Sequence, residues 1–139
     1  MPSLAASLVA ASALITLALG LAHLAYTFHG PKLLPRDPAL QARMAEVCPV
    51  ITRQTTVWRC WIGFNASHSL GLVLFGAVYG QLALASEAAL FRSPFLLSLG
   101  LLGLLAYAAL ARRYFFSTPL RAVSVAIALY LGGAIAGLF

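Results

Sequence analysis

Four apolar runs separated by more polar segments dominate this chain and limit what it can fold into. In chain order they are residues 4–28, 60–85, 95–111 and 122–139. A helix that spans a bilayer needs about 20 mostly apolar residues, with a range of about 17–25. Only 9% of the residues are charged, against roughly 25% in a soluble domain. We therefore predict an all-α integral membrane protein, with four transmembrane helices in a single domain over residues 1–139. Strands are excluded because four of them cannot close a barrel and open sheet edges are costly in lipid.

The placement of the basic residues predicts how the spans are oriented. Between the first and second runs lie Lys32, Arg36, Arg43, Arg53 and Arg59, and between the third and fourth lie Arg112, Arg113 and Arg121. Only Arg92 lies between the second and third runs. Cytoplasmic loops carry the excess of Lys and Arg in membrane proteins. We expect a multi-pass protein of the bacterial inner (plasma) membrane with both termini outside. The net charge of +6 is then explained by the basic residues that orient the protein in the membrane. We expect no nucleic-acid partner, because the chain has no soluble domain to carry an exposed basic face.

The first cytoplasmic loop is long and predicts a short helix of its own. Asp37-Pro38 is a typical helix start, with the aspartate as N-cap and proline at the first position, and Pro49 stops the helix. We expect residues 39–47 to lie flat on the inner membrane surface. The other connections are short, which predicts an antiparallel four-helix bundle.

Two glycine pairs, Gly76/Gly80 and Gly133/Gly137, have the G-x-x-x-G spacing that lets helix backbones approach closely in lipid. They predict either packing within the chain or the seam of a homo-oligomer.

Polar residues inside the spans form one stripe on each of two helices. The first run carries Thr16, Gly20, His23 and Thr27, and the second carries Trp58, Trp61, Asn65 and His68. Counting from the membrane boundary, His23 is expected level with Asn65, roughly 7–9 Å inside it, with His68 about one turn deeper. Tyr107 on the third helix falls near the same level.

These residues predict a polar site in the cytoplasmic leaflet, built from His23, Asn65, His68 and Tyr107. Arg59, Arg112 and Arg113 stand at the membrane surface, where arginine can hold a carboxylate or phosphate. We expect binding of a membrane lipid or an amphipathic small molecule, and whether the molecule is also modified stays open. A purely structural role for the cluster, as hydrogen bonds across helices, also stays open.

Metal and cofactor sites are less well supported by the sequence. No metal site is expected, because zinc would need a third or fourth ligand within the spans. Haem remains an alternative, although His23 and His68 differ in depth by about 4 Å by the helix rise, which suits a single bis-histidine haem poorly. Cys48 and Cys60 are expected to be two unpaired thiols.

Residues 61–71, with Ala22-His23-Leu24, resemble an uncharacterised group of small bacterial four-span membrane proteins. The chain also resembles, more weakly and in architecture, the membrane-associated eicosanoid and glutathione metabolism (MAPEG) family. That resemblance implies trimers with sites between subunits and glutathione as cofactor or substrate. Trp61, Asn65 and His68 stand at the spacing where that family has Arg, Asn and Glu, so only Asn65 matches. The alternative functions are thus a glutathione-transferase-like membrane enzyme and an accessory subunit of a larger membrane complex.

Overall fold

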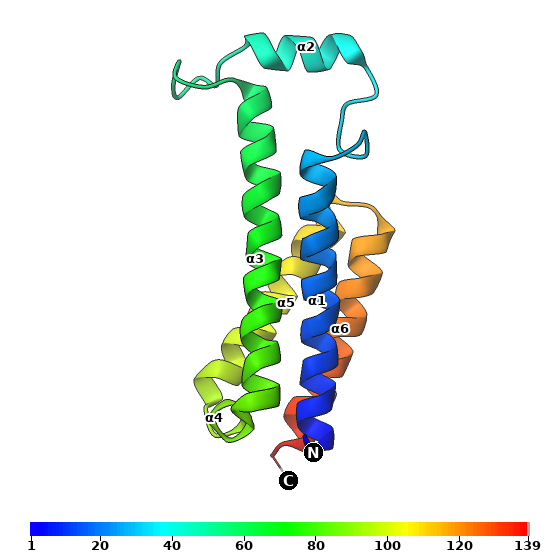
Figure 1. Ribbon diagram of the computed structural model, residues 1–139, viewed down its shortest axis with the longest axis vertical. Coiled ribbons are helices and arrows are strands. Elements are labelled where there is room, and N and C mark those ends of the chain that lie inside the picture. The colour runs from blue at the N-terminus through cyan, green and yellow to red at the C-terminus, as the bar shows by residue number, and fades with distance from the viewer. Residues whose placement is uncertain (139) are drawn as a thin grey trace. The chain divides into compact units, whose positions relative to one another are not determined.

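The computed structural model describes residues 1–138, and helices are the only regular elements over that range. Figure 1 shows them in chain order: α1 (Leu4–Phe28), α2 (Pro38–Glu46), α3 (Val57–Ala85), α4 (Glu87–Phe91), α5 (Pro94–Tyr114) and α6 (Ser117–Ala136). Helices α1, α3, α5 and α6 are long and apolar enough to cross a membrane. The predicted all-α class with four candidate spans is therefore confirmed.

The long helices match the apolar runs except at their polar ends. Helix α1 coincides with the predicted 4–28, whereas α3 begins at Val57 and α5 continues to Tyr114. Helix α6 begins at Ser117, earlier than predicted, and ends at Ala136; the last residue of the predicted span, 139, lies outside the described range. The apolar runs mark the part that lipid can cover, but helical hydrogen bonding continues through polar residues until a cap ends it. Arg112 and Arg113 can extend α5 because cations are favourable in the last turn of a helix.

Helix α2 forms where the sequence predicts it, one residue earlier at each end. The Asp37 side chain accepts a hydrogen bond from the Ala39 backbone N–H at 2.9 Å, with Pro38 in the first helical position. Helix α4 is a difference from the prediction, because the segment between the second and third spans was expected as a loop. It is only five residues long, which is too short for hydrophobic periodicity to indicate a helix.

The described residues pack into two compact units. Unit 1 comprises residues 1–19 and 72–138, and unit 2 comprises residues 20–71. Unit 1 therefore holds the first part of α1, the second part of α3, and all of α4, α5 and α6. Unit 2 holds the end of α1, all of α2, and the start of α3.

The core of unit 1 depends on close backbone approach at glycines. A Cβ atom on Gly76 would lie 2.6 Å from the Ala13 carbonyl oxygen, and one on Gly133 would lie 2.8 Å from the Ala5 carbonyl oxygen. Glycine thus lets both α3 and α6 pack directly against α1. Gly76 and Gly133 are thus used for packing inside the chain, and a homo-oligomer seam through Gly76/Gly80 or Gly133/Gly137 stays a prediction.

Side-chain hydroxyl groups in unit 1 find backbone acceptors on neighbouring helices. Ser12 donates to the Ala126 carbonyl at 2.7 Å, and Tyr79 donates to the Leu96 carbonyl at 2.8 Å. Tyr130, almost fully buried, donates to the Leu97 carbonyl at 3.1 Å. Such pairing is needed because no water is available in the hydrocarbon core to satisfy a polar group.

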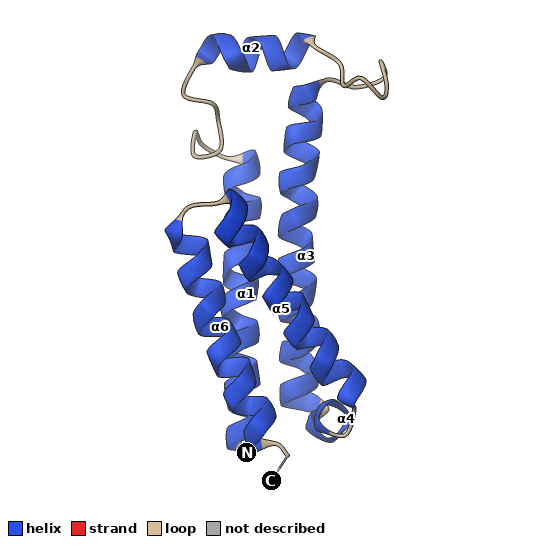
Figure 2. Ribbon diagram, turned by 180° about the vertical axis from the view of Figure 1, so that it is seen from behind, coloured by secondary structure: helices blue, strands red, loops and turns tan. Residues whose placement is uncertain are grey.

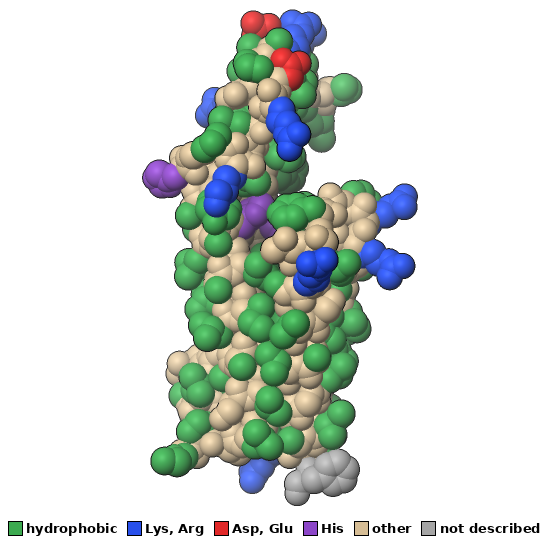
Figure 3. All heavy atoms as spheres, turned by 90° about the vertical axis from the view of Figure 1, so that its right-hand side faces the viewer, with side chains coloured by type: hydrophobic (Ala, Val, Ile, Leu, Met, Phe, Trp, Pro, Cys, Tyr) green, Lys and Arg blue, Asp and Glu red, His purple; other side chains and the backbone are tan. Residues whose placement is uncertain are grey.

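Helices α5 and α6 lie side by side in front of α1 in Figure 2, which is seen from behind, and a short connection joins them. At the other end of unit 1, the Ser3 hydroxyl donates to the Glu87 carboxylate of α4. On the face in Figure 3, hydrophobic side chains cover the long helices, and Lys and Arg side chains are confined toward their ends. This distribution matches what a membrane-spanning protein requires.

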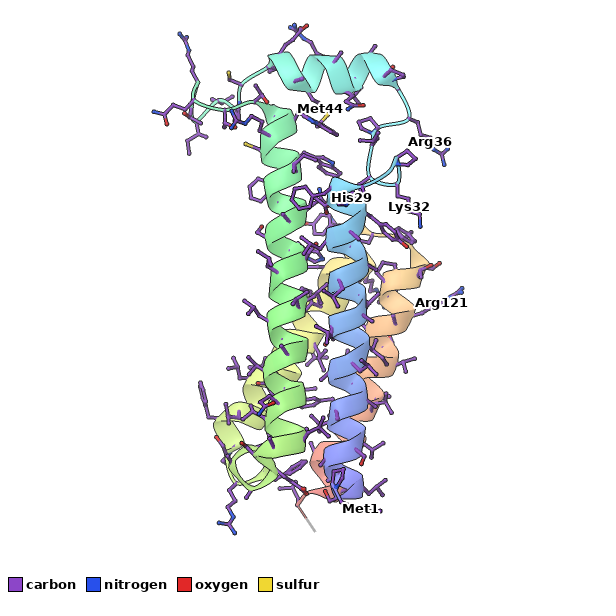
Figure 4. All side chains as sticks on the ribbon, in the orientation of Figure 1. Met1, His29, Lys32, Arg36, Met44 and Arg121 are labelled. Atoms are coloured by element: carbon purple, nitrogen blue, oxygen red, sulfur yellow. The ribbon has the colours of Figure 1, made fainter. Side chains whose placement is uncertain are left out.

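Unit 2 is closed by hydrogen bonds between its loops and α3. Figure 1 shows α2 lying across the ends of α1 and α3. The Trp61 indole N–H donates to the Leu33 carbonyl at 3.2 Å, and the Val57 N–H donates to the Val47 carbonyl at 2.8 Å. Met44, half-buried, lies on the side of α2 that faces these helix ends (Figure 4).

Candidate functional site

The candidate site is a cluster of three polar side chains in unit 2, contributed by two apolar helices. His23 comes from α1, and Asn65 and His68 come from α3. The His23 Nε2 atom and the Asn65 Oδ1 atom are 2.9 Å apart. The expected level pairing of these two residues is thus observed. It follows from the constant helix rise, because the two residues are equally far from the ends of their apolar runs at Phe28 and Cys60.

The hydrogen bonds of Asn65 determine how the cluster is oriented. Its amide Nδ2 donates to the Trp61 carbonyl at 2.8 Å, and a carbonyl can only accept. This assigns Oδ1 as the atom that faces His23. Because Oδ1 is itself only an acceptor, His23 must carry its proton on Nε2 and donate. The neutral His23 ring therefore keeps Nδ1 as an acceptor.

His68 lies next to His23 in an edge-to-face arrangement. The ring centroids are 5.4 Å apart, with an interplanar angle of 75°. Rings in direct contact leave no space for a porphyrin between them, so this pair does not fit a bis-histidine haem. Among the residues that the structure describes, no group of three or more His, Cys, Asp or Glu is placed to hold a metal ion.

Two hydroxyl groups support the backbone beside the cluster. Thr27 donates to the His23 carbonyl at 2.8 Å, and Ser69 donates to the Asn65 carbonyl at 2.7 Å. Both bonds run back four residues along the same helix, a pattern that keeps a polar side chain satisfied inside an apolar span. Thr27 belongs to the polar stripe of α1, and Ser69 is fully buried beside the stripe of α3.

The cluster is accessible and is not sealed in a core. His23, Asn65 and His68 are all half-buried, whereas the core of unit 1 holds side chains that are almost fully covered. Asn65 uses one N–H of its amide on Trp61, and its second N–H and second oxygen lone pair are not taken up by the bonds described here. The site can therefore offer both donors and acceptors to a molecule that approaches from the side.

The remaining predicted site residues are divided between the two units. Arg59 belongs to unit 2, where it is exposed in the first turns of α3. Tyr107, Arg112 and Arg113 belong to unit 1, on the last turns of α5, with Tyr107 half-buried and the two arginines exposed. Their part in the same site stays a prediction.

Sequence reasoning missed two contacts made by the segment that follows α1 in unit 2. The Lys32 ammonium lies 3.8 Å from the centroid of the Tyr26 ring, a cation–π contact at the end of α1. The Trp61 indole is bonded to the Leu33 carbonyl. Both contacts depend on the path of the irregular segment after α1, which no periodic pattern encodes.

The cysteines and the third histidine lie apart from this cluster. Cys48 and Cys60 are unpaired thiols, both half-buried. Figure 4 places His29 at the end of α1, next to the loop that carries Lys32 and Arg36. His29 is exposed, so it is a natural control for the two histidines of the site.

Comparison with protein-family models, with curated proteins and with solved structures gives no match.

Proposed function

We propose that this protein binds the polar head of a membrane lipid or an amphipathic small molecule at His23, Asn65 and His68. The observation that carries the proposal is the His23–Asn65 hydrogen bond of 2.9 Å with the His68 ring against it, half-buried on the side of two apolar helices. Ionisable residues such as histidine are rare within membrane spans because burying them in lipid is costly, and those that occur commonly belong to ligand or ion sites. Apolar helix surfaces around the cluster would hold the body of such a molecule.

The chemistry of unit 2 favours an acidic head group over a basic one. Its two acidic residues, Asp37 and Glu46, are in or beside α2, where one caps the helix and the other pairs with Arg43. No carboxylate lies on the parts of α1 and α3 that carry the cluster. Lys32 and Arg59 are the basic residues nearest in sequence to the cluster on α1 and α3 and lie toward the same ends of these helices. A carboxylate or phosphate would find a donor in the second N–H of the Asn65 amide.

The membrane setting of the proposal is an antiparallel four-helix protein of the bacterial inner membrane. The basic residues of the two connecting segments would then face the cytoplasm, and both termini would lie outside. This orientation places the cluster in the cytoplasmic leaflet, within reach of a molecule that enters from lipid or from the cytosol.

A direct test is retention of a photoactivatable fatty acid by the full-length protein in lipid nanodiscs. Losing one hydrogen bond to a charged head costs about 1.5–3 kcal/mol, which corresponds to about 10–150-fold in affinity. We expect losses in that range for Asn65→Ala and His68→Ala. The matched controls are His29→Ala, an exposed histidine outside the spans, and Ser67→Ala, an exposed polar residue of α3 whose hydroxyl bonds only to the Phe64 carbonyl.

Two outcomes would overturn the proposal. Equal crosslinking of all four variants would mean that the probe binds elsewhere. Loss of folding in Asn65→Ala and His68→Ala, together with unchanged binding by the folded fraction, would assign the cluster to helix packing and favour the accessory-subunit alternative.

A further inference from the structure

The loop between α2 and α3 presents two large apolar side chains at its tip. Pro49 begins a turn that the Thr52 N–H closes by donating to the Pro49 carbonyl at 3.2 Å. Val50 and Ile51 are the central residues of this turn. Val50 is fully exposed and Ile51 is 92% exposed. Turn centres are usually occupied by Gly, Asn, Asp or Ser, so two adjacent β-branched residues here need a reason.

The tip is presented by a closed loop. The Val57 N–H donates to the Val47 carbonyl at 2.8 Å, which ties the two ends of the loop together. Inside it, the Gln54 N–H donates to the Thr52 hydroxyl at 3.1 Å, and the Cys48 thiol contacts the Arg53 carbonyl at 3.8 Å. Loops whose ends meet and whose interior is hydrogen-bonded are compact and frequently functional.

The charge carried by this loop and by the start of α3 points to an anionic partner. Of the basic residues in the segment, Arg43 is paired with Glu46. The others lie on the loops and helix ends of the same unit without a carboxylate partner: Lys32, Arg36, Arg53 and Arg59. Arg53 belongs to the loop itself and is exposed. Lys32 and Arg36 lie at the other end of α2 (Figure 4), so the positive charge beside the tip comes from Arg53 and from Arg59 in the first turns of α3. An apolar tip beside basic side chains is the composition that binds the interface of an anionic bilayer.

The position of the loop next to α3 favours a lipid surface over a protein as the partner of the tip. Residue Val57, where the loop ends, is also the first residue of α3, a helix long and apolar enough to cross a membrane. The loop is therefore held beside the point where α3 enters the bilayer. We propose that the Val50–Ile51 tip inserts into the head-group region of an anionic lipid surface and, with Arg53, fixes α2 and the start of α3 at the membrane interface. This interaction is independent of the ligand proposed for His23, Asn65 and His68.

The test uses the 139-residue chain in two kinds of nanodisc. The anionic nanodiscs contain phosphatidylglycerol mixed with phosphatidylcholine, and the neutral ones contain phosphatidylcholine alone. Cys48→Ser and Cys60→Ser remove the native thiols, and the serine at 48 keeps a hydroxyl donor for the Arg53 carbonyl. Ile51→Cys then carries an environment-sensitive fluorophore. The matched control carries the fluorophore on Ala42→Cys, an exposed position on the opposite side of α2 from Met44.

We expect the label at residue 51 to show blue-shifted emission and to lose most of its fluorescence to a lipid-borne quencher, whereas the label at residue 42 responds to aqueous iodide. Adding Arg53→Gln should reduce lipid quenching at residue 51 several-fold in the anionic nanodiscs. Iodide quenching of the label at residue 51 in both lipid mixtures would overturn the proposal. Protection from both quenchers would also overturn it, because the tip would then be covered by protein.

Discussion

Gly76 and Ala13 bring the backbones of α3 and α1 into direct contact, since a Cβ atom on Gly76 would lie 2.6 Å from the Ala13 carbonyl oxygen. The same Cβ atom would lie 2.7 Å from the Leu17 Cβ atom. Neither neighbour is the end of a flexible side chain, so an added methyl group cannot be accommodated without moving a helix.

We therefore expect Gly76→Ala to lower the free energy of unfolding by about 1–3 kcal/mol, the usual cost of overpacking a tight interior. Gly63→Ala is the matched control on the same helix, because a Cβ atom there has no neighbour within 4 Å. Reversible unfolding in mixed detergent micelles measures both. Equal effects of the two substitutions would mean that the loss of helix flexibility, and not the contact with α1, matters.

Adjacent glycines on α6 allow a second comparison. A Cβ atom on Gly133 would lie 2.7 Å from a methyl group of Val9, whereas one on Gly132 meets only a Leu8 methyl group at 3.6 Å. We expect Gly133→Ala to destabilise the protein by about 1–3 kcal/mol and Gly132→Ala to change stability by much less. Thermal unfolding gives the stability, and native mass spectrometry counts subunits. A change in subunit number without loss of stability in Gly133→Ala would assign that glycine to an oligomer seam.

The sequence predicts the four long helices and the level pairing of His23 with Asn65, because both depend on regular helices. Hydrophobic run length alone places the four long helices, and the fixed helix rise places His23 level with Asn65. Hydrophobic run length does not locate the caps that end a helix. The observed ends of α3, α5 and α6 therefore differ by a few residues from the ends of the predicted apolar runs. The five-residue helix α4 has no periodicity to detect.

Other contacts cannot be predicted because they depend on tertiary packing. The Trp61–Leu33 bond requires the path of an irregular segment. Tyr79 on α3 and Tyr130 on α6 donate to adjacent backbone carbonyls at the start of α5. Their positions in the sequence do not predict that these two side chains meet. The depth of a residue can be counted from a boundary, whereas the rotation of one helix against another is set by packing.

The two buried tyrosines give a prediction about hydrogen bonding in unit 1. Their rings meet edge to face with centroids 5.8 Å apart, and both hydroxyl groups donate to backbone carbonyls at the start of α5. Removing one such bond in a membrane protein costs about 0.6 kcal/mol on average and up to about 1.7. We expect Tyr79→Phe and Tyr130→Phe to lower the free energy of unfolding within that range. Tyr114→Phe, at an exposed position, is the control, and a loss of the same size there would contradict the assignment.

A double-mutant cycle across the His23–Asn65 bond distinguishes a structural role from a ligand-binding role, provided that both stability and binding are measured in it. With His23→Ala, Asn65→Ala and the double variant, we expect a coupling of about 0.6 kcal/mol in unfolding, and at most about 1.7. A parallel cycle of His23→Ala with Ser67→Ala should show additivity, because Ser67 bonds within its own helix. Binding of the photoactivatable fatty acid should fall about tenfold or more in each single variant, which exceeds what such a small stability change explains. If binding instead falls only in proportion to the folded fraction, the bond holds α1 against α3 in unit 2 and contributes nothing further to recognition.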